Sequence, residues 1–332
     1  MSNPMDGSRT LLYLSNADVV SVGPSMVETI PLLESILEAR GRGELIMPPK
    51  VALFGSAANW YHAQLSYSPS MSRGAIKWQS GYPTNLGIGL PSIMGLLILN
   101  DGATGAPLVV MESSWLTAQR TGAVSAVTAK SLGKTGARGV ALIGCGTQAR
   151  TQLEALSEAL PMIESVYLYD IDAQAAQRFE DWAVGTFAKL GFYTLASARA
   201  AVEAADIVVT MGPIVKDPAR PIEADWLQAG ALGLPLDYDC YWSAAALRAA
   251  DRYFVDDLEQ YNGYRTHGDF FQDDVTVSGD LPHVLVGQVT GRESDDQRII
   301  SMNLGLAVED LAMAVEIARR AEAASVGQRL PL

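Results

Sequence analysis

Residues 140–149 of this chain read VALIGCGTQA. The four apolar residues predict a short strand, and the segment 148–160 has the apolar pattern of a helix. Gly144, Gly146 and Ala149 lie where a dinucleotide-binding turn places two glycines and a third small residue. The first permits a tight turn, the second lets the backbone approach a pyrophosphate, and the third lets helix and strand pack closely. The stretch therefore predicts a Rossmann-type nucleotide domain.

An acidic residue after the next apolar segment supports this prediction. Residues 166–169 are followed by Asp170, which lies 24 residues after Gly146. That spacing is close to the ~20 residues expected for the acid that binds the adenosine ribose. A carboxylate there accepts hydrogen bonds from the ribose hydroxyls and would repel a 2′-phosphate, which favours NAD over NADP. The alternative is that Asp170 only caps a turn with Asp172.

The order of the expected elements divides the chain into two domains. Strand and helix patterns alternate through residues 134–299, which predicts an α/β domain with a parallel sheet. Residues 46–111 are rich in strand patterns, so residues 1–133 are expected to form a β-rich α+β domain. A long apolar-periodic helix follows at 304–324, and pattern alone assigns it to neither domain. The length of 332 residues agrees with two domains.

Composition argues against several classes of partner. The net charge of −13 argues against nucleic acid, and no apolar run approaches the ~20 residues of a membrane helix. The polar start of the chain does not resemble a signal peptide, and Cys145 and Cys240 are its only cysteines, so we expect a cytoplasmic protein. The three histidines are far apart and form no zinc-type spacing, so we expect no metal.

Six segments, in order along the chain, resemble those of the ornithine cyclodeaminase and mu-crystallin family. They are residues 77–85 (KWQSGYPTN), 116–123 (LTAQRTGA), 144–149, 169–172, 291–297 and 303–310. The chain departs from the family at residues 61–68 and 230–239, which we expect to reshape the substrate pocket. The resemblance implies a Rossmann domain for NAD. It also implies a first domain that binds substrate, forms a homodimer and is completed by residues 300–332.

The resemblance also assigns site residues. Lys50, Lys77 and Arg120 would surround the carboxylate of the substrate, and the planar guanidinium of Arg120 suits a bidentate contact. Lys77 would also serve as an acid or base if burial or a neighbouring cation lowers its pKa. Further contacts to the substrate would come from Ser92, Leu304 and Gly305. Contacts to the cofactor would come from Gly144, Gly146, Thr147, Gln148, Ala149, Asp170 and Thr121.

A carboxylate is implied beside the reacting nitrogen. Asp239 falls where the family keeps an acid that steers the amino group and activates water or a second amine. Asp237 is the alternative, because the alignment is uncertain in this segment. Glu309 and Asp310, near the start of the last helix, are expected to be structural or to interact with the helix dipole.

The activity implied by the resemblance is hydride transfer at a carbon that bears nitrogen. The preferred form is ornithine cyclodeaminase: hydride passes from L-ornithine to NAD, the side-chain amine attacks the imine, ammonia leaves, and the hydride returns to give proline. The alternative in the same pocket is an amino-acid dehydrogenase or a ketimine/imine reductase with net redox. A non-catalytic mu-crystallin-like binder is the alternative of another class. The expected partners are an amino acid or cyclic imine and a second copy of the chain.

Overall fold

The computed structural model describes residues 9–332 except residues 57–58, 216 and 269. The chain forms two compact units. Unit 1 comprises Met1–Leu32, Gly43–Arg120 and Leu306–Leu332, and unit 2 comprises Leu33–Arg42 and Thr121–Gly305. The last helix therefore belongs to unit 1. The boundary expected after residue 133 falls inside unit 2, because helix α3 (Ser114–Leu132) runs across the division.

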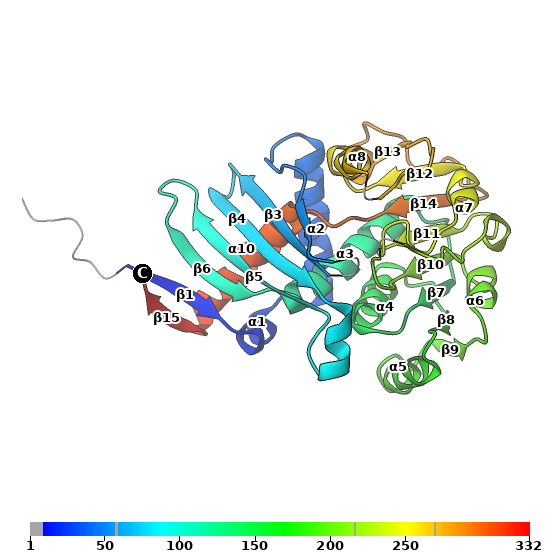
Figure 1. Cartoon of the computed structure of the whole chain (residues 1–332), viewed down its shortest axis with the longest axis horizontal. Coiled ribbons are helices and arrows are strands. Elements are labelled where there is room, and N and C mark those ends of the chain that lie inside the picture. The colour runs from blue at the N-terminus through cyan, green and yellow to red at the C-terminus, as the bar shows by residue number, and fades with distance from the viewer. Residues whose placement is uncertain (1–8, 57–58, 216, 269) are drawn as a thin grey trace, which may run out of the picture. The chain divides into compact units, whose positions relative to one another are not determined.

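Unit 1 is built on a seven-stranded mixed sheet (Figure 1). Its strand order is β15-β1-β6-β5-β4-β3-β2, in which β1 and β6 are parallel and the other neighbours antiparallel. The strands are β1 (Thr10–Leu14), β2 (Val51–Phe54), β3 (Trp60–Ser68), β4 (Arg73–Gly81), β5 (Ile93–Asp101), β6 (Pro107–Glu112) and β15 (Gln328–Pro331). A short 3₁₀ helix, η1 (Pro83–Ile88), lies between β4 and β5.

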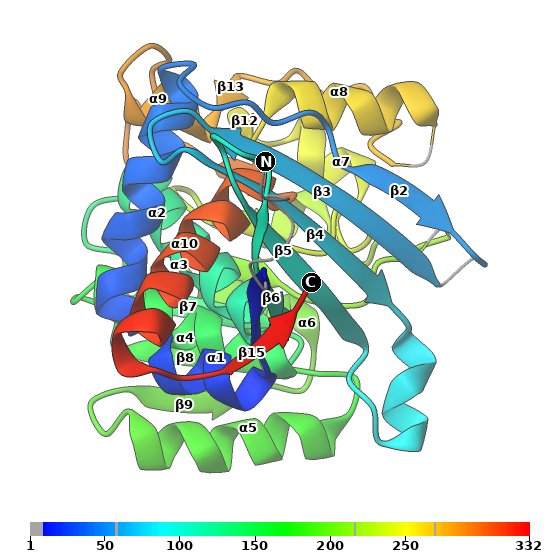
Figure 2. The same ribbon diagram turned by 90° about the vertical axis from the view of Figure 1, so that its left-hand side faces the viewer.

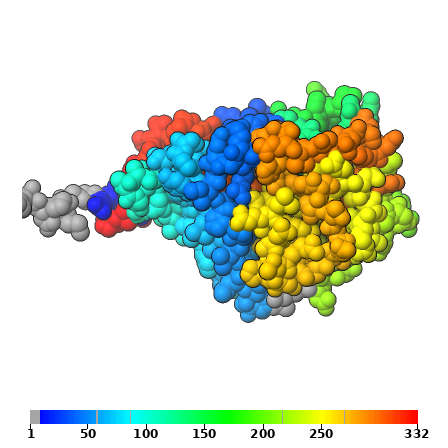
Figure 3. Space-filling model, turned by 90° about the horizontal axis from the view of Figure 1, so that it is seen from above, coloured from blue at the N-terminus to red at the C-terminus, as the bar shows by residue number. Residues whose placement is uncertain are grey.

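One long helix covers what we call the inner face of this sheet. Helix α10 (Ala307–Ala324) packs against β3, β4 and β5 (Figure 2). Most of its side chains are buried. Helix α1 (Asn16–Val22) packs on α10 and is followed by α2 (Met26–Gly41). Strand β15 pairs with β1, so the end of the chain lies beside the start of the described residues (Figure 3).

Unit 2 is a doubly wound sheet of eight strands in the order β13-β12-β14-β11-β10-β7-β8-β9, all paired in parallel. The strands are β7 (Gly139–Ile143), β8 (Ser165–Tyr169), β9 (Gly191–Thr194), β10 (Ile207–Thr210), β11 (Leu232–Pro235), β12 (Arg252–Val255), β13 (Gly279–Asp280) and β14 (Ile299–Met302). The helices after β7 are α4 (Thr147–Ala159), α5 (Ala173–Thr186), α6 (Ala198–Ala204), η2 (Ala224–Trp226), α7 (Ala244–Arg248), α8 (Leu258–His267) and α9 (Leu281–Leu285). The strand order reverses between β7 and β10, which makes that point the topological switch of the sheet.

The core of unit 2 explains why its strands read as continuous apolar runs. Helices cover both faces of a parallel sheet, so side chains on both faces of a central strand are buried. Val140, Leu142, Ile207, Val209 and Leu232 are all fully buried in one cluster. The predicted fold class, a Rossmann-type parallel sheet with a second, β-rich unit, is confirmed.

Three further observations concern the described residues alone. None of their helices is by itself long and apolar enough to cross a membrane, although α1 and α2, bent by 92° at the break between them, pass that test as a pair. No group of three or more His, Cys, Asp or Glu side chains among them is arranged to hold a metal ion. Cys145 and Cys240 are both free and buried.

Candidate functional site

The glycine turn after β7 has the backbone geometry that pyrophosphate binding needs. Gly144 has a φ of 101°, which residues with a side chain rarely adopt, and its N–H donates to the Tyr169 carbonyl at 2.8 Å. A Cβ at Gly144 would also lie 3.3 Å from the Met211 carbonyl oxygen. Gly146 is the N-cap of α4, where a Cβ would meet no atom within 4 Å and no side chain caps the helix. Ala149, in the first turn of α4, is fully buried. The N-terminus of α4 is therefore open to an anion.

Asp170 ends β8 beside this turn. One oxygen of its carboxylate accepts from the Cys145 N–H at 2.7 Å and the other from the Asp172 N–H at 2.9 Å. The turn-capping bond considered as the alternative role is thus present. Each carboxylate oxygen has two acceptor sites, so the same geometry keeps acceptors for ribose hydroxyls. The turn and this acid together fit NAD: one accommodates the pyrophosphate and the other the ribose.

In unit 1, two of the predicted cations are buried against two carboxylates. Lys77 lies on β4, and its Nζ is 2.8 Å from Oδ1 and 2.7 Å from Oδ2 of Asp310. Arg120 on α3 places Nη1 3.0 Å from Oε2 of Glu309 and Nε 3.3 Å from Oδ1 of Asp310. Thr117, also on α3, accepts a hydrogen bond from Nζ of Lys77 at 3.3 Å. The structure therefore brings Lys77 and Arg120 together.

Glu309 and Asp310 are the ion-pair partners of the two cations, a pairing that the sequence analysis did not predict. They begin α10 and are 0% and 1% exposed, yet both are ionisable. Burying a charge is costly unless it is paired, so a buried Lys77 and Arg120 each need an anion. Two adjacent acids at the start of an otherwise apolar helix were the available signal. The expected role, structural or an interaction with the helix dipole, did not name these cations as partners.

Burial shifts the pKa values of two side chains in this part of unit 1. Burial lowers the pKa of Lys77 to about 8, even though Asp310 acts in the opposite direction. Burial, and then Lys50 and Lys77, lower the pKa of His62 on β3 well below its usual value, so the imidazole is neutral. Lys50 acts electrostatically on both His62 and Lys77, so all three predicted cations influence this part of unit 1.

The two candidate acids of unit 2 follow β11, and each is only 1% exposed. Asp237 accepts from the Thr210 hydroxyl at 2.8 Å and from the Gly212 N–H at 3.0 Å. Both donors lie at the end of β10, so Asp237 fastens the carboxyl ends of two neighbouring strands. Burial raises the pKa of Asp237 to about 7.

Asp239 is paired with a cation that the sequence did not indicate. Its carboxylate contacts Nη2 of Arg220 and accepts from the Phe271 N–H at 3.0 Å. Nη1 of the same guanidinium contacts Asp273. Burial raises the pKa of Asp239, and Arg220 opposes that effect. Among the described residues, Asp237 and Asp239 thus differ in their partners: hydrogen-bond donors hold the first and an arginine the second.

The remaining residues that were predicted to contact the substrate or the cofactor are divided between the two units. Unit 1 holds Lys50, which precedes β2, and Ser92, which precedes β5. Unit 2 holds Leu304, Gly305, Thr121, Thr147 and Gln148. The φ of Gly305 is 81°, and its N–H donates to the Asp256 carboxylate at 2.6 Å, so the backbone there favours glycine. The roles of these residues stay predictions.

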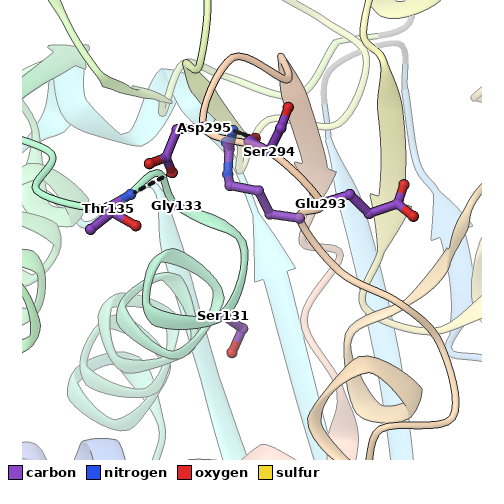
Figure 4. Close-up of a pocket in the computed structure, with 7 residues that line it drawn as sticks. Ser131, Gly133, Thr135, Glu293, Ser294 and Asp295 are labelled. Atoms are coloured by element: carbon purple, nitrogen blue, oxygen red, sulfur yellow. Dashed lines mark hydrogen bonds between the residues drawn. The ribbon is translucent and has the colours of Figure 1, made fainter.

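A polar cavity of about 390 Å³ opens elsewhere in unit 2 (Figure 4). It is lined by Ser131, Gly133, Thr135, Arg292, Glu293, Ser294 and Asp295. The guanidinium of Arg292 donates to the carbonyls of Leu132 at 2.8 Å, Gly230 at 3.0 Å and Ser294 at 3.2 Å. These segments precede β7, β11 and β14, so the cavity lies at the amino edge of the sheet. Doubly wound sheets bind ligands at the carboxyl edge, and we therefore assign Arg292 to fastening the end of α3.

Comparison with known proteins identifies the family of this chain. The model of the ornithine cyclodeaminase/mu-crystallin family matches residues 12–325. The chain belongs to the ornithine cyclodeaminase/mu-crystallin family. A relative in this family, the nodulation efficiency protein NfeD of Rhizobium meliloti, is 35% identical over 316 residues, which cover 95% of this chain and 97% of the relative.

Two solved structures resemble this family member over nearly its whole length. The Thermococcus litoralis Δ(1)-pyrroline-2-carboxylate reductase, in complex with NADH and L-proline, has a TM-score of 0.86 and 28% identity, covering 96% of this chain and 100% of the other. An archaeal alanine dehydrogenase dimer with bound NAD has a TM-score of 0.86 and 29% identity, covering 98% and 100%. The predicted family is confirmed. The prediction of NAD is confirmed at the level of the family, because both neighbours hold that cofactor.

Proposed function

We propose that this family member is an NAD-dependent amino-acid dehydrogenase or imine reductase that transfers hydride at the α-carbon of an α-amino or α-imino acid. The observation that carries the proposal is the pair of buried cations in unit 1, Lys77 and Arg120, which share the Asp310 carboxylate. Cations held this way suit the carboxylate of an amino or imino acid. The solved relatives act, by name, on Δ(1)-pyrroline-2-carboxylate and alanine, each of which offers one carboxylate.

The side chains would divide the work between holding the substrate and handling protons. When bound, NAD supplies the hydride acceptor or donor. Arg120 holds the substrate carboxylate with its planar fork, and Lys77 holds it with a point charge. Because the pKa of Lys77 is about 8, its ammonium also exchanges a proton readily near neutral pH. Asp239 steers the amino group of the substrate.

Ornithine cyclodeaminase, the activity preferred from the sequence, is the second candidate. Asp239 favours it, because that reaction needs a buried carboxylate for the second amine of ornithine. However, Arg220 already pairs with Asp239, so a second amine would have to compete with this guanidinium for the carboxylate. We therefore place the dehydrogenase or reductase first. No contact among the described residues favours the non-catalytic binder over these enzymes.

A spectrophotometric assay tests the proposal. The purified protein is mixed with NADH and either Δ(1)-pyrroline-2-carboxylate or pyruvate with ammonia, and the absorbance of NADH is followed. We expect net oxidation of NADH with at least one of these substrates. In a parallel reaction, L-ornithine and a trace of NAD⁺ are incubated and the products identified by mass. Proline formed without net NADH would favour the cyclodeaminase, and no turnover in any reaction would reject both activities.

The role of Asp239 has its own test. Asp239→Asn is expected to lower turnover about 100-fold, the order of a lost acid–base or orienting group, with the affinity for NADH retained. Asp273→Asn is the matched control, since Asp273 contacts the same arginine but carries no predicted role. Equal turnover in the wild type and Asp239→Asn would remove Asp239 from the site.

We also propose that the protein is a homodimer that buries the outer face of the unit 1 sheet. The sheet is amphipathic in an unusual sense: His62, Gln64 and Lys77 point to the inner face, while apolar side chains occupy the outer one. Cross-strand partners Trp78 and Leu96 are 48% and 47% exposed. A contiguous apolar surface of this kind marks an interaction site. The archaeal alanine dehydrogenase is a dimer, and a second copy is the occupant we propose here.

The cytoplasmic location expected from the sequence also stays a proposal. Cys145 and Cys240 are free and buried, which agrees with a reducing compartment. Burial raises the pKa of each thiol to about 12, so neither is a reactive thiolate. Both cysteines thus act as small apolar side chains.

A further inference from the structure

Three polar side chains lie on the inner face of β3 and β4 beside Lys77. Gln64 is the cross-strand partner of Lys77, and His62 is the partner of Gln79, which follows Lys77 by two residues. Residues directly opposite each other have Cβ atoms about 5 Å apart. Residues two apart on one strand share a face of the sheet. His62, Gln64 and Gln79 therefore form one polar group next to Lys77, which we call the polar row.

The polar row is buried without partners. His62 is 5% exposed, Gln64 3% and Gln79 5%. Among the residues that the structure describes, none of these three side chains makes a hydrogen bond. The ring of His62 stacks on that of Trp60, with the ring centroids 4.2 Å apart, which leaves its nitrogens free to bond. Polar groups that are removed from water are nearly always paired, so three of them in one place indicate a bound ligand or ordered water.

The next inward residue of β3 shows the contrast with a paired position. Ser66 is also buried, but its hydroxyl donates to the Ala307 carbonyl of α10 at 2.9 Å. The same helix supplies Asp310 to Lys77. Helix α10 thus provides partners for this face at Ser66 and at Lys77, and within the described chain it provides none to the polar row. The row is the part of the face that is left for a ligand.

The chemistry of the polar row suits an oxygen atom. Each glutamine amide has two N–H donors and a carbonyl acceptor, and a neutral imidazole has one donor and one acceptor. Burial, Lys50 and Lys77 lower the pKa of His62 well below its usual value, so its ring is neutral. An aliphatic ligand would leave these buried groups unpaired, and a site built to hydrogen-bond its ligand discriminates strongly for that reason.

We propose that the polar row binds the side chain of the substrate, and that the substrate is an α-amino or α-imino acid whose side chain carries an oxygen atom, as a hydroxyl, a carboxamide or a carboxylate. The inference rests on the proposed function, in which Lys77 and Arg120 hold the α-carboxylate of the same substrate. The polar row lies next to Lys77 on the same sheet, so one ligand reaches both. The row determines specificity and takes no part in hydride transfer.

Isosteric pairs of amino acids test this inference by binding, without turnover. L-Serine and L-2-aminobutyrate differ by a hydroxyl in place of a methyl group. L-Asparagine and L-leucine differ by a carboxamide in place of an isopropyl group, and L-aspartate extends that pair to a carboxylate. NADH and an amino acid are both reduced and cannot react. By isothermal titration calorimetry with NADH present, the wild type is expected to bind the polar member of at least one pair at least about tenfold more tightly than the apolar one.

Variants of the polar row show whether it causes this preference. Gln64→Met/Gln79→Met keeps the length of both side chains and removes their amides, so the preference is expected to fall to within about threefold. Ser66→Ala is the matched control on the same face, because α10 already pairs with its hydroxyl, and should keep the preference of the wild type. Circular dichroism reports folding. If the double variant does not fold, each single variant should still lower the preference about threefold.

The outcomes separate this inference from the proposed function. A wild type without preference for the polar member of any pair, which still oxidises NADH with an imine, would reject the role of the polar row and leave the function standing. Ordered water would then be its occupant. Unchanged preference in the folded Gln64→Met/Gln79→Met variant would reject the role as well. A wild type that binds no amino acid with NADH and reduces no imine would overturn the proposed function and the inference together.

Discussion

Lys77 is a buried lysine whose charge depends on a single neighbouring acid. Burial lowers its pKa to about 8, and the contact with Asp310 keeps it from falling further. As the pH rises through this value the ammonium of Lys77 loses its proton, and with it the positive charge that is proposed to hold a substrate carboxylate. We expect the affinity for L-alanine or L-proline, measured with NADH, to fall as the pH rises through about 8.

Asp310→Asn should move the fall in affinity to lower pH. The Asp310 carboxylate raises the pKa of Lys77 against the effect of burial, and the variant lacks that carboxylate. Glu316→Gln on the same helix is the control, since Glu316 pairs with Arg319 and Arg320 and not with the cluster. The assignment is contradicted if the affinity of the wild type is independent of pH across this range, or if both variants shift alike.

Asp237 is expected to make the free energy of unfolding, rather than the affinity for a ligand, depend on pH. Its pKa in the folded chain is about 7, raised from 3.8 by burial. Between these values the folded state binds more protons than the unfolded state, so the contribution of Asp237 to stability is lost as the pH rises toward about 7. Urea unfolding across this window should show that loss in the wild type and a smaller one in Asp237→Asn. Parallel curves for the two proteins would mean that Asp237 does not titrate there.

At the scale of the residue, the sequence predicted the cations of the candidate site better than the acids that pair with them. Lys77 and Arg120 lie in segments that resemble the family, so their position near each other was expected. Their partner acids lie some 190 residues or more along the chain, on α10, and only the fold brings them together. Arg220 was missed for the same reason. Its segment carries no motif, and its pairing with Asp239 depends on a left-handed backbone that sequence patterns do not reveal.

At the scale of the element, the apolar segments that became β7 and β8 were recognised, because a buried parallel strand is a continuous apolar run. Strand β3 carries no such signal. Its inward side chains His62, Gln64, Ser66 and Ser68 are buried but polar, so the usual pattern of apolar residues facing the core is reversed. Strand β13 has only two residues, too few for a period to be visible.

Arg292 is expected to stabilise the junction between elements rather than the reaction. It fastens the carbonyl of Leu132, at the end of α3, to that of Gly230, which precedes β11. Arg292→Ala leaves several carbonyls without this donor and should lower the free energy of unfolding by about 3 kcal/mol in urea unfolding. Arg138→Ala is the control, because Arg138 and Glu164 form an exposed pair and should change it by less than about 0.5 kcal/mol. An equal loss of unfolding free energy in both variants would contradict this role of Arg292.

At the scale of the whole molecule, the unit 1 sheet has its polar side chains under α10 and its apolar ones outside. Water would face Val51, Leu53, Trp78, Leu96 and Ile98 in a monomer. Burying apolar surface is the main favourable term in association. A second copy that covers this face would therefore remove the free-energy cost of exposing these side chains to water. The polar inner face is explained by the site, because Lys77 and His62 need it. In the function and dimer proposed here, the two faces thus have complementary roles, one for the substrate and one for the second copy.

Introducing charge on the outer face should therefore separate the dimer. In Trp78→Glu/Leu96→Glu, two cross-strand partners become like charges, which desolvation and repulsion would penalise in a buried interface. We expect the wild type to have twice the mass of the chain by light scattering after size-exclusion chromatography, and the double variant to have the mass of one chain. Val184→Glu is the control, because Val184 is a single exposed apolar residue on α5 of unit 2 and should leave the mass unchanged. A monomeric wild type would reject the dimer, whereas a dimeric double variant would place the interface on another surface.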